Sequence, residues 1–248
     1  MPANFVFYRG PSMIDGAPII AIATMPRSNR KTGDMIQTWI MRADVNPIDA
    51  ARRGLDASIC GACVHRGKHD ANGNRIPSTR SCYVRLDTAP LNVWSTEGRG
   101  RYDDLTADLT IAADRVSGRL VRLGSYGDPA AVPYAVWDTL LSRAAGHTGY
   151  THQWRAFPEF AQWVMASCDS SADRVFARTL GYRTFRVAAA ATWSREPGEI
   201  LCPASEEAGK KTVCAACKAC GGNNAKARAD VMIPAHGGGR GLVAGGAA

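Results

Sequence analysis

The chain has 248 residues, of which 46% are hydrophobic and 21% charged, as in an ordinary globular protein with one large domain or two small ones. No stretch approaches the ~18 apolar residues of a membrane span, and residues 1–10 lack the charged start and apolar run of a signal peptide. We therefore expect a cytoplasmic protein. Thiols stay reduced there, so its eight cysteines favour metal ligation over disulfides.

The formal net charge of +8 suits a polyanionic partner, because basic side chains gain affinity for nucleic acid by releasing phosphate counterions. A basic surface that only keeps the protein soluble explains the same charge. The best candidates for phosphate contacts are Arg99, Arg101, Arg183 and Arg186. Charge alone leaves nucleic-acid binding open.

The first 50 residues predict a β-hairpin, with strands at residues 17–25 and 37–41 around a polar turn at residues 27–33. Beyond residue 100, short apolar runs alternate with segments of helical spacing. The expected helices are residues 105–116, 133–144, 160–164 and 172–180, the last capped by Ser170 or Ser171. The expected strands are residues 119–125, 147–154, 164–167, 183–188, 199–202 and 230–234.

This alternation predicts right-handed βαβ units and an α/β fold with a parallel sheet, as a partial or full barrel or as an open doubly wound sheet. No GxGxxG or GxxxxGK[ST] pattern opens a helix, so the usual nucleotide-binding sheets lose support. We expect an N-terminal β-rich segment at residues 1–50, an α/β core at 51–200, a Cys-rich metal-binding region at 201–236 and a flexible tail at 237–248.

Seven of the eight cysteines fall into two sets, and the first cysteine set is Cys60, Cys63 and Cys82. A Cys-x2-Cys turn lets two thiolates approach one metal, and the third cysteine follows after 18 residues. Three protein ligands leave one coordination position open, which is typical of a catalytic site. His65 or His69, in the polar loop between these cysteines, would close that position in a structural zinc site.

The second cysteine set is Cys202, Cys214, Cys217 and Cys220. Four thiolates are enough to close a site, around either a tetrahedral zinc or a cubane iron–sulfur cluster. His236 makes a zinc site of three cysteines and one histidine a further alternative. The spacing does not separate zinc from iron. Cys168 stands alone and is expected to be a small buried hydrophobe.

Two further residues are candidates for catalysis. Asp128 follows the expected strand at 119–125, and a carboxylate at the C-terminal end of a parallel strand is well placed for chemistry. A turn aspartate that helps to start the next helix explains it equally well. His152 is the candidate acid–base group, with a core-facing aromatic stripe as the alternative. Capping of the following helix accounts for Asp169.

Four segments together resemble a group of small phage-encoded proteins associated with the radical S-adenosylmethionine barrel: ICGACVHRG…SCYV, RLGSYGDPAAVP, GYTHQW and CPAS…CAACKACGG…VMIPAHG. They span about residues 56–238. The resemblance implies a partial (β/α) barrel with an N-terminal hairpin and a Cys-rich C-terminal extension. It also implies a [4Fe–4S] cluster on Cys60, Cys63 and Cys82, and an auxiliary cluster or zinc on the second cysteine set.

In that class, the open iron of the cluster binds S-adenosylmethionine, and an electron from a donor protein cleaves the cofactor to a 5′-deoxyadenosyl radical. Some phages rebuild thymine bases in their own DNA, which protects it from host restriction, and similar enzymes isomerise the appended amino acid. The resemblance therefore implies an isomerase that acts on a modified base of DNA in the host cytoplasm, without a membrane partner. Such an enzyme must bring the base out of the stack unless the appendage already protrudes.

Two alternatives remain open. A base-exchange transglycosylase acting on nucleic acid would use zinc on Cys214, Cys217, Cys220 and His236, together with two strand-end aspartates, Asp128 and Asp169. That reading leaves the first cysteine set without a role. A non-enzymatic protein that holds zinc and grips nucleic acid through its basic face would bind with strong salt dependence.

Overall fold

A single sheet organises the fold, with strand order β4-β1-β2-β3-β5-β6-β7-β8-β10-β9 in residues 4–26 and 29–243, which the computed structural model describes. Its strands are β1 (Phe5–Pro11), β2 (Pro18–Thr24), β3 (Met35–Arg42), β4 (Asp103–Asp104), β5 (Leu120–Tyr126), β6 (Gly146–Thr151), β7 (Met165–Cys168), β8 (Thr184–Ala188), β9 (Glu199–Leu201) and β10 (Asp230–Pro234). The α-helices of the described residues are α1 (Pro47–Arg52), α2 (Ala57–Cys60), α3 (Ala89–Glu97), α4 (Leu109–Arg115), α5 (Tyr134–Leu141), α6 (Ser171–Thr179) and α7 (Cys214–Cys217). Short 3-10 helices are η1 (Val64–Arg66), η2 (Pro129–Ala131), η3 (Pro158–Gln162), η4 (Gly222–Asn224) and η5 (Arg240–Leu242).

The predicted N-terminal hairpin is confirmed, since β2 and β3 pair antiparallel. Sequence reasoning missed β1, which adds a third antiparallel strand at the other edge of β2. Arg27 and Ser28, in the predicted turn, lie outside the described residues. The hairpin is not a separate layer, because β3 also pairs in parallel with β5 and so continues into the rest of the sheet.

The predicted alternation beyond residue 100 is also confirmed, with β5, β6, β7, β8 and β10 pairing in parallel. β6 ends at Thr151, three residues earlier than predicted. The next backbone amide, His152 N, donates to the Asp128 Oδ2 at 2.7 Å and not to a neighbouring strand. Ser170 caps α6 through a hydrogen bond from Asp173 N, as expected. The segment expected as a short helix at 160–164 is the 3-10 helix η3.

In the strand order of the described residues, β4 and β9 stand at the two ends of the sheet. The fold is therefore α/β with a mostly parallel sheet and an N-terminal antiparallel hairpin, without the strand closure that defines a full barrel. None of the helices in the described part of the chain is both long and apolar enough to cross a bilayer.

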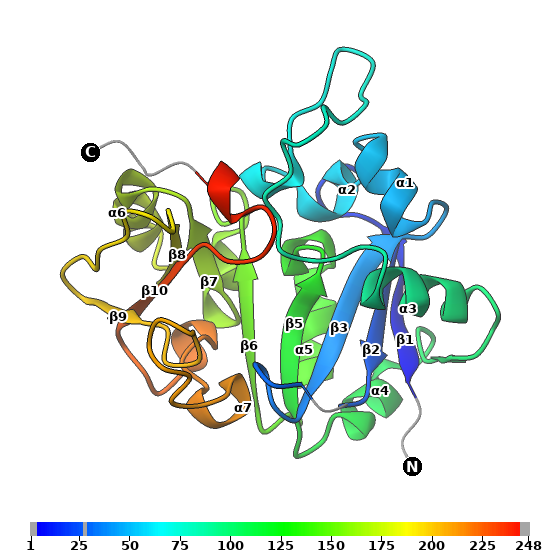
Figure 1. Ribbon diagram of the computed structural model, residues 1–248. Helices are drawn as coiled ribbons and strands as arrows, with labels where there is room; N and C mark the ends of the chain where they lie inside the picture. Colours follow the sequence, from blue (N-terminus) through cyan, green and yellow to red (C-terminus); the bar gives the residue numbers. More distant parts are fainter. Residues whose placement is uncertain (1–3, 27–28, 244–248) are drawn as a thin grey trace.

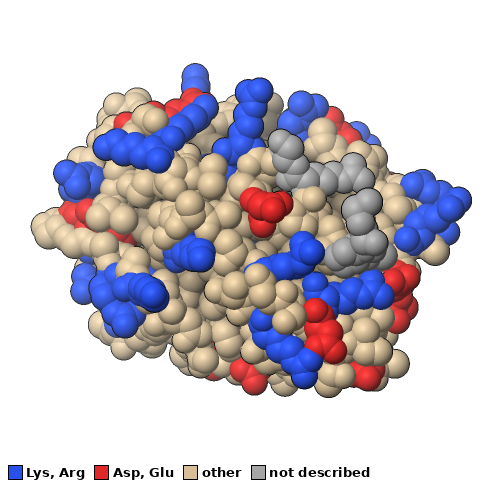
Figure 2. Space-filling model, turned by 90° about the horizontal axis from the view of Figure 1, so that it is seen from below, with Lys and Arg blue, Asp and Glu red and all other residues tan. Residues whose placement is uncertain are grey.

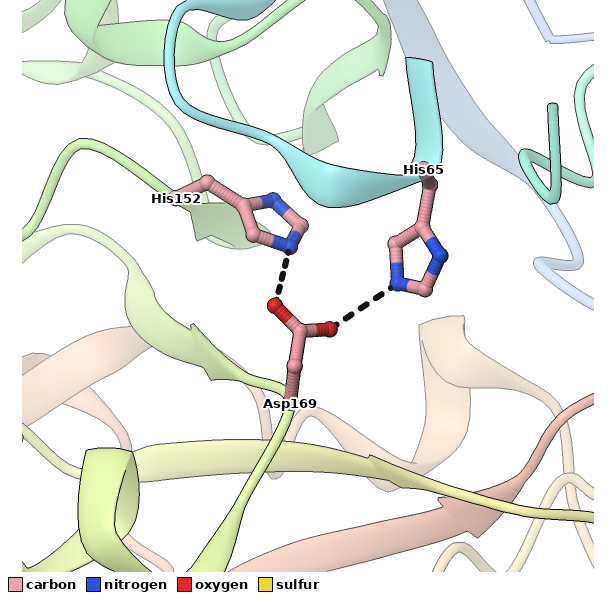
Figure 3. A group of neighbouring side chains, drawn as sticks. All are labelled: His65, His152 and Asp169. Carbon is pink, nitrogen blue, oxygen red and sulfur yellow. Dashed lines mark ion pairs between the residues drawn. The ribbon is translucent and has the colours of Figure 1, made fainter. Parts of the chain in front are cut away.

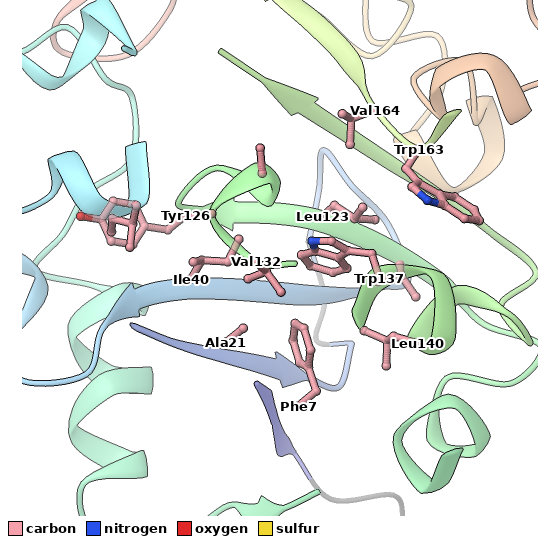
Figure 4. Packing of buried hydrophobic residues seen from close by; sticks show 14 of the residues in the cluster. Phe7, Ala21, Ile40, Leu123, Tyr126, Val132, Trp137, Leu140, Trp163 and Val164 are labelled. Carbon is pink, nitrogen blue, oxygen red and sulfur yellow. The ribbon is translucent and has the colours of Figure 1, made fainter. Parts of the chain in front are cut away.

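One face of the sheet packs against helices α4 and α5, which Figure 1 shows behind the strands. Trp137 of α5 is fully buried there beside Phe7, and its indole Nε1 donates to Pro129 O at 2.8 Å. Figure 4 shows Leu123 and Ile40 from two central strands in the same cluster. Burying each large apolar side chain contributes about 1.5–3 kcal/mol, so this layer fixes the strands whose ends carry the candidate site.

The segment between α2 and α3 arches over the C-terminal ends of the parallel strands, at the top of Figure 1. The expected tail at 237–248 begins beside this segment: the α-carbon of Gly239 faces Ser81 so closely that an added Cβ would lie 2.6 Å from the Ser81 Cα. η5 follows, and residues 244–248 lie outside the described part of the chain.

Candidate active site

A cavity of about 390 Å³ lies on the face of the sheet opposite Trp137. Its floor comes from alternate residues of the parallel strands: Arg122 and Gly124 of β5 face the cavity, whereas Val121 and Leu123 of the same strand face the core. Side chains from β3, β5, β6, β7, β8 and β10 all line it. Six neighbouring parallel strands therefore contribute to one pocket.

The structure brings the first cysteine set to this cavity, and Cys60, Cys63 and Cys82 all line it. The 18 residues between Cys63 and Cys82 form an excursion that folds back, with His69 and Arg75 bridged in antiparallel fashion and Cys82 N donating to His65 O at 3.0 Å. A sequence separation this wide is thus compatible with three thiols on one cavity wall.

The turn of the Cys-x2-Cys pair is held by Gln153. Its amide Nε2 donates to Cys60 O at 2.9 Å, and its Oε1 accepts from Ala62 N at 3.2 Å. Gly61, between the two, has φ +50°, and a Cβ there would lie 2.2 Å from Gln153 Oε1. The close approach of Gln153 therefore requires glycine at this position.

Both cysteine sets consist of free thiols. Burial is the main cause that raises the pKa of Cys60 well above its ordinary value, and Asp56 and the thiolates of Cys63 and Cys82 add to it. Metal binding at this set must therefore displace protons. Burial likewise raises the pKa of Cys220 to about 12.

Among the described residues, no three cysteine Sγ atoms lie within 4.8 Å of one another. The ligands of one tetrahedral zinc, with Zn–S bonds of about 2.3 Å, stand about 3.8 Å apart. A cubane cluster spreads its thiolates over separate iron atoms. As placed, the thiols of neither set stand at the spacing of ligands around a single ion.

The second cysteine set packs in one apolar cluster at the other end of the cavity, around Met165, Phe185 and Val231. Cys202 and Cys220 are buried and Cys214 and Cys217 are half-buried. Cys202 and Cys214 also line the cavity. The sequence does not predict that two cysteines of the second set line the same pocket as Cys82, which lies 120 residues before Cys202.

Asp128 caps the next short helix and also lies on the cavity wall. Gly127, with φ +80°, turns the chain at the end of β5, and a Cβ there would lie 2.5 Å from Ile40 O. Asp128 Oδ1 accepts from Ala130 N at 3.0 Å and so caps η2, while Oδ2 accepts from His152 N. Asp128 also lines the cavity, and burial raises the pKa of its carboxyl group although these hydrogen bonds oppose the shift.

His152, the other predicted catalytic residue, lies with His65 and Asp169 in a compact group (Figure 3). His65 Nε2 stands 3.0 Å from Asp169 Oδ1, and His152 Nε2 stands 3.4 Å from Asp169 Oδ2. Burial opposes the shift, but the two histidines together lower the pKa of Asp169. The interpretation of Asp169 as a helix cap is wrong, because Ser170 takes that position and leaves the carboxylate free for the histidines.

His236 lines the cavity, where its Nε2 contacts the Lys31 ammonium at 3.1 Å and its ring lies 5.4 Å from that of Tyr83. These contacts place it beside a cation, on the cavity wall. Burial lowers the pKa of both His236 and Lys31.

Two of the four predicted phosphate ligands are used inside the protein. Arg183 donates to the carbonyl oxygens of Ala219 and Gly222, and Arg186 pairs with Glu199 at 2.6 Å. Arg99 and Arg101 are exposed and away from the cavity lining. Arg122, which the sequence analysis did not single out, is a cation on the floor of the cavity.

The Arg122 side chain is buried, with 8% of its residue surface exposed. Its Nη2 donates to the Tyr83 hydroxyl at 3.3 Å and its guanidinium lies 5.3 Å from the centre of the Tyr150 ring. No carboxylate of the described residues forms an ion pair with it. A buried guanidinium can bind an anionic group with charge-assisted hydrogen bonds.

The face shown in Figure 2 has no single basic patch, because basic side chains are spread over it with acidic ones between them. The fold and the cavity define an α/β protein with thiols at both ends of one pocket. Comparison with protein-family models, curated proteins and solved structures finds no match for this chain. Function is therefore argued from the cavity.

Proposed function

We propose that this chain is an iron–sulfur enzyme of the radical S-adenosylmethionine-like type, with its [4Fe–4S] cluster on Cys60, Cys63 and Cys82. The observation that carries the proposal is that these three free thiols, from a turn and the far end of a long excursion, line one cavity together with Asp128 and His152. Thiolate ligands on a pocket wall are what an open, reactive cluster needs.

The order of the strands supports a partial barrel of the radical S-adenosylmethionine type. β3, the first of the six parallel strands that line the cavity, leads through α1 into the loop that holds the first cysteine set. In parallel α/β barrels the reacting groups sit at the C-terminal ends of the strands, where this loop and Asp128 lie.

When bound, the cluster and S-adenosylmethionine would supply the one-electron cleavage, with the electron coming from a donor protein. The chain's own residues position and shield that centre. Gln153 fixes the Cys-x2-Cys turn, and Asp128 holds the backbone of His152 at the strand end. His152 stands between the thiolate of Cys63 and Asp169, which raise its pKa well above the ordinary value although burial opposes this.

The substrate that fits best is a nucleotide with a modified base. Arg122 and Lys31 are among the cations of the cavity that can meet a phosphate or the carboxylate of an appended amino acid. A cavity of about 390 Å³ is too small for a duplex. A base in DNA would therefore have to leave the stack, as an isomerase for thymine appendages requires.

Anaerobic purification followed by metal analysis and visible absorption tests the proposal. We expect roughly four to eight irons per chain and a broad brown absorbance, depending on whether the second set also holds a cluster. Reduction in the presence of S-adenosylmethionine should then yield 5′-deoxyadenosine. A colourless protein with two zincs would contradict the proposal.

Replacing Arg122 by methionine tests the anionic substrate. We expect the wild-type protein to bind thymidine monophosphate about tenfold or more tightly than thymidine, because a charged hydrogen bond to phosphate contributes about 1.5–3 kcal/mol. Arg122→Met should erase that difference in calorimetric titrations. Arg155→Met, which removes an exposed guanidinium over Trp154, is the control and should keep it. If both variants prefer thymidine monophosphate over thymidine equally, Arg122 does not bind the phosphate.

A second candidate, base exchange in nucleic acid, is favoured by one observation. Asp128 follows β5 and Asp169 follows β7, the two strands on either side of β6, and both aspartates contact His152. Two strand-end carboxylates are what a transglycosylase needs for nucleophile and base. Incorporation of labelled guanine into DNA by iron-free protein, lost in Asp128→Asn, would favour this candidate over the iron–sulfur enzyme.

A further inference from the structure

The spacing of His65, His152 and Asp169 is that of ligands around one metal ion. Their three facing ligand atoms lie within 4.8 Å of one another, and the two nitrogen–oxygen distances are 3.0 Å and 3.4 Å. Ligands of a tetrahedral ion with bonds of about 2.0–2.1 Å stand about 3.3 Å apart. In Figure 3 the two imidazoles point at different oxygens of the one carboxylate.

The two ion pairs of this group do not have the geometry of well-aligned hydrogen bonds. His152 Nε2 and Asp169 Oδ1 are fully buried, and among the described residues neither makes a hydrogen bond of good geometry. Such atoms are rare in folded proteins and each needs an explanation. A cation between them would satisfy both.

The orientation of His65 points the same way. Its Nδ1 lies 2.7 Å from the Ser81 hydroxyl, and we assign that contact as Nδ1–H donating to Ser81 Oγ. The lone pair of Nε2 then faces Asp169 Oδ1, and two lone pairs 3.0 Å apart repel unless a cation lies between them. A hydroxyl or carbonyl on the second nitrogen is the usual support of a metal-binding histidine.

Each ligand is also held by its own element. His65 lies in η1, and its carbonyl oxygen accepts a hydrogen bond from Cys82 N. His152 is fixed through its backbone by Asp128, and Asp169 joins β7 to the capped helix α6. Ligands on fixed elements form a site without costly rearrangement.

We propose that His65, His152 and Asp169 bind one divalent transition-metal ion of the Mn²⁺, Fe²⁺ or Zn²⁺ class. Two imidazole nitrogens and one carboxylate oxygen are the donor set such ions take, with positions left open for substrate or water. His65 and His152 line the cavity, so the open positions face the bound ligand and its anionic groups. No cysteine is among its ligands, so the site does not require that the cysteines hold a cluster.

Manganese titration of the full-length, anaerobically purified protein, followed by the electron paramagnetic resonance signal of free Mn²⁺, tests the proposal. Mn²⁺ is the probe because soft thiolates do not select it, so the cysteine sets do not compete. We expect one bound ion per chain, with affinity about 100-fold or more lower in Asp169→Asn and in His65→Gln. Ser81→Ala, which removes the support of His65, should weaken binding about tenfold.

His69→Gln is the matched control, because His69 lies in the same excursion but outside the ligand group, and its affinity should match that of the wild type. A cooperative thermal unfolding transition shows that each variant folds. If Asp169→Asn does not fold, His65→Gln alone carries the test. Wild-type protein that binds no Mn²⁺, or affinity unchanged in the folded variants, would overturn the site. A brown protein that binds no Mn²⁺ would contradict this site but not the proposed cluster. A colourless protein that binds one Mn²⁺ would contradict the cluster but not this site.

Discussion

Cys60→Ala is expected to abolish reductive cleavage of S-adenosylmethionine. Cys60 is one of only three thiols of its set, so its loss leaves a cluster of the first set with two protein ligands. We expect the iron content to fall by about four per chain and the 5′-deoxyadenosine yield to drop to that of a protein-free control. Iron analysis and chromatography of the reaction products measure both.

Cys168→Ala is the control for this prediction. Cys168 is the last residue of β7, is fully buried in the core and lines no part of the cavity, so its replacement should keep iron and cleavage. Cleavage that survives Cys60→Ala would remove the first cysteine set from catalysis. Loss of cleavage in both variants would instead mean that the assay reports folding.

The sheet could be predicted because its signals are local. Strand runs bounded by turn residues and helices capped by serine, as Ser170 caps α6, follow from neighbouring residues alone. β1 escaped because FVFYRGP offers little alternation, and its partner β2 is buried along nearly its whole length. Whether the parallel strands curve into a partial barrel depends on packing across the sheet, which no local pattern encodes.

The cavity could be predicted only in part. The Cys-x2-Cys spacing marked metal ligands, but nothing in the sequence shows that Cys82 returns to the same wall through its hydrogen bond to His65 O. His65 and Asp169, 104 residues apart, meet only because β7 ends beside the loop that carries His65. Arg186 resembled a phosphate ligand until its partner Glu199 was known.

That pair belongs to a buried ion network that ties together α6, β8, β9 and β10. Glu199 accepts from Arg186 Nε at 2.7 Å and Nη2 at 2.6 Å, and Arg174 binds Asp230 at 3.0 Å. The Glu199 side chain is 0% exposed, and those of Arg174 and Arg186 are 7% and 10% exposed. Removing one partner of such a network leaves a buried charge uncompensated.

We therefore expect Glu199→Gln to lower the free energy of unfolding by about 3–5 kcal/mol in urea titrations. Glu206→Gln removes only an exposed partner of Lys210 and should leave the urea midpoint unchanged. Adding Arg186→Met to Glu199→Gln should recover part of the loss, because the buried guanidinium that keeps only its longer 3.5 Å ion pair with Glu196 is then gone. If the double variant is no more stable than Glu199→Gln alone, the cost of the single change comes from packing around β9 and not from the uncompensated guanidinium.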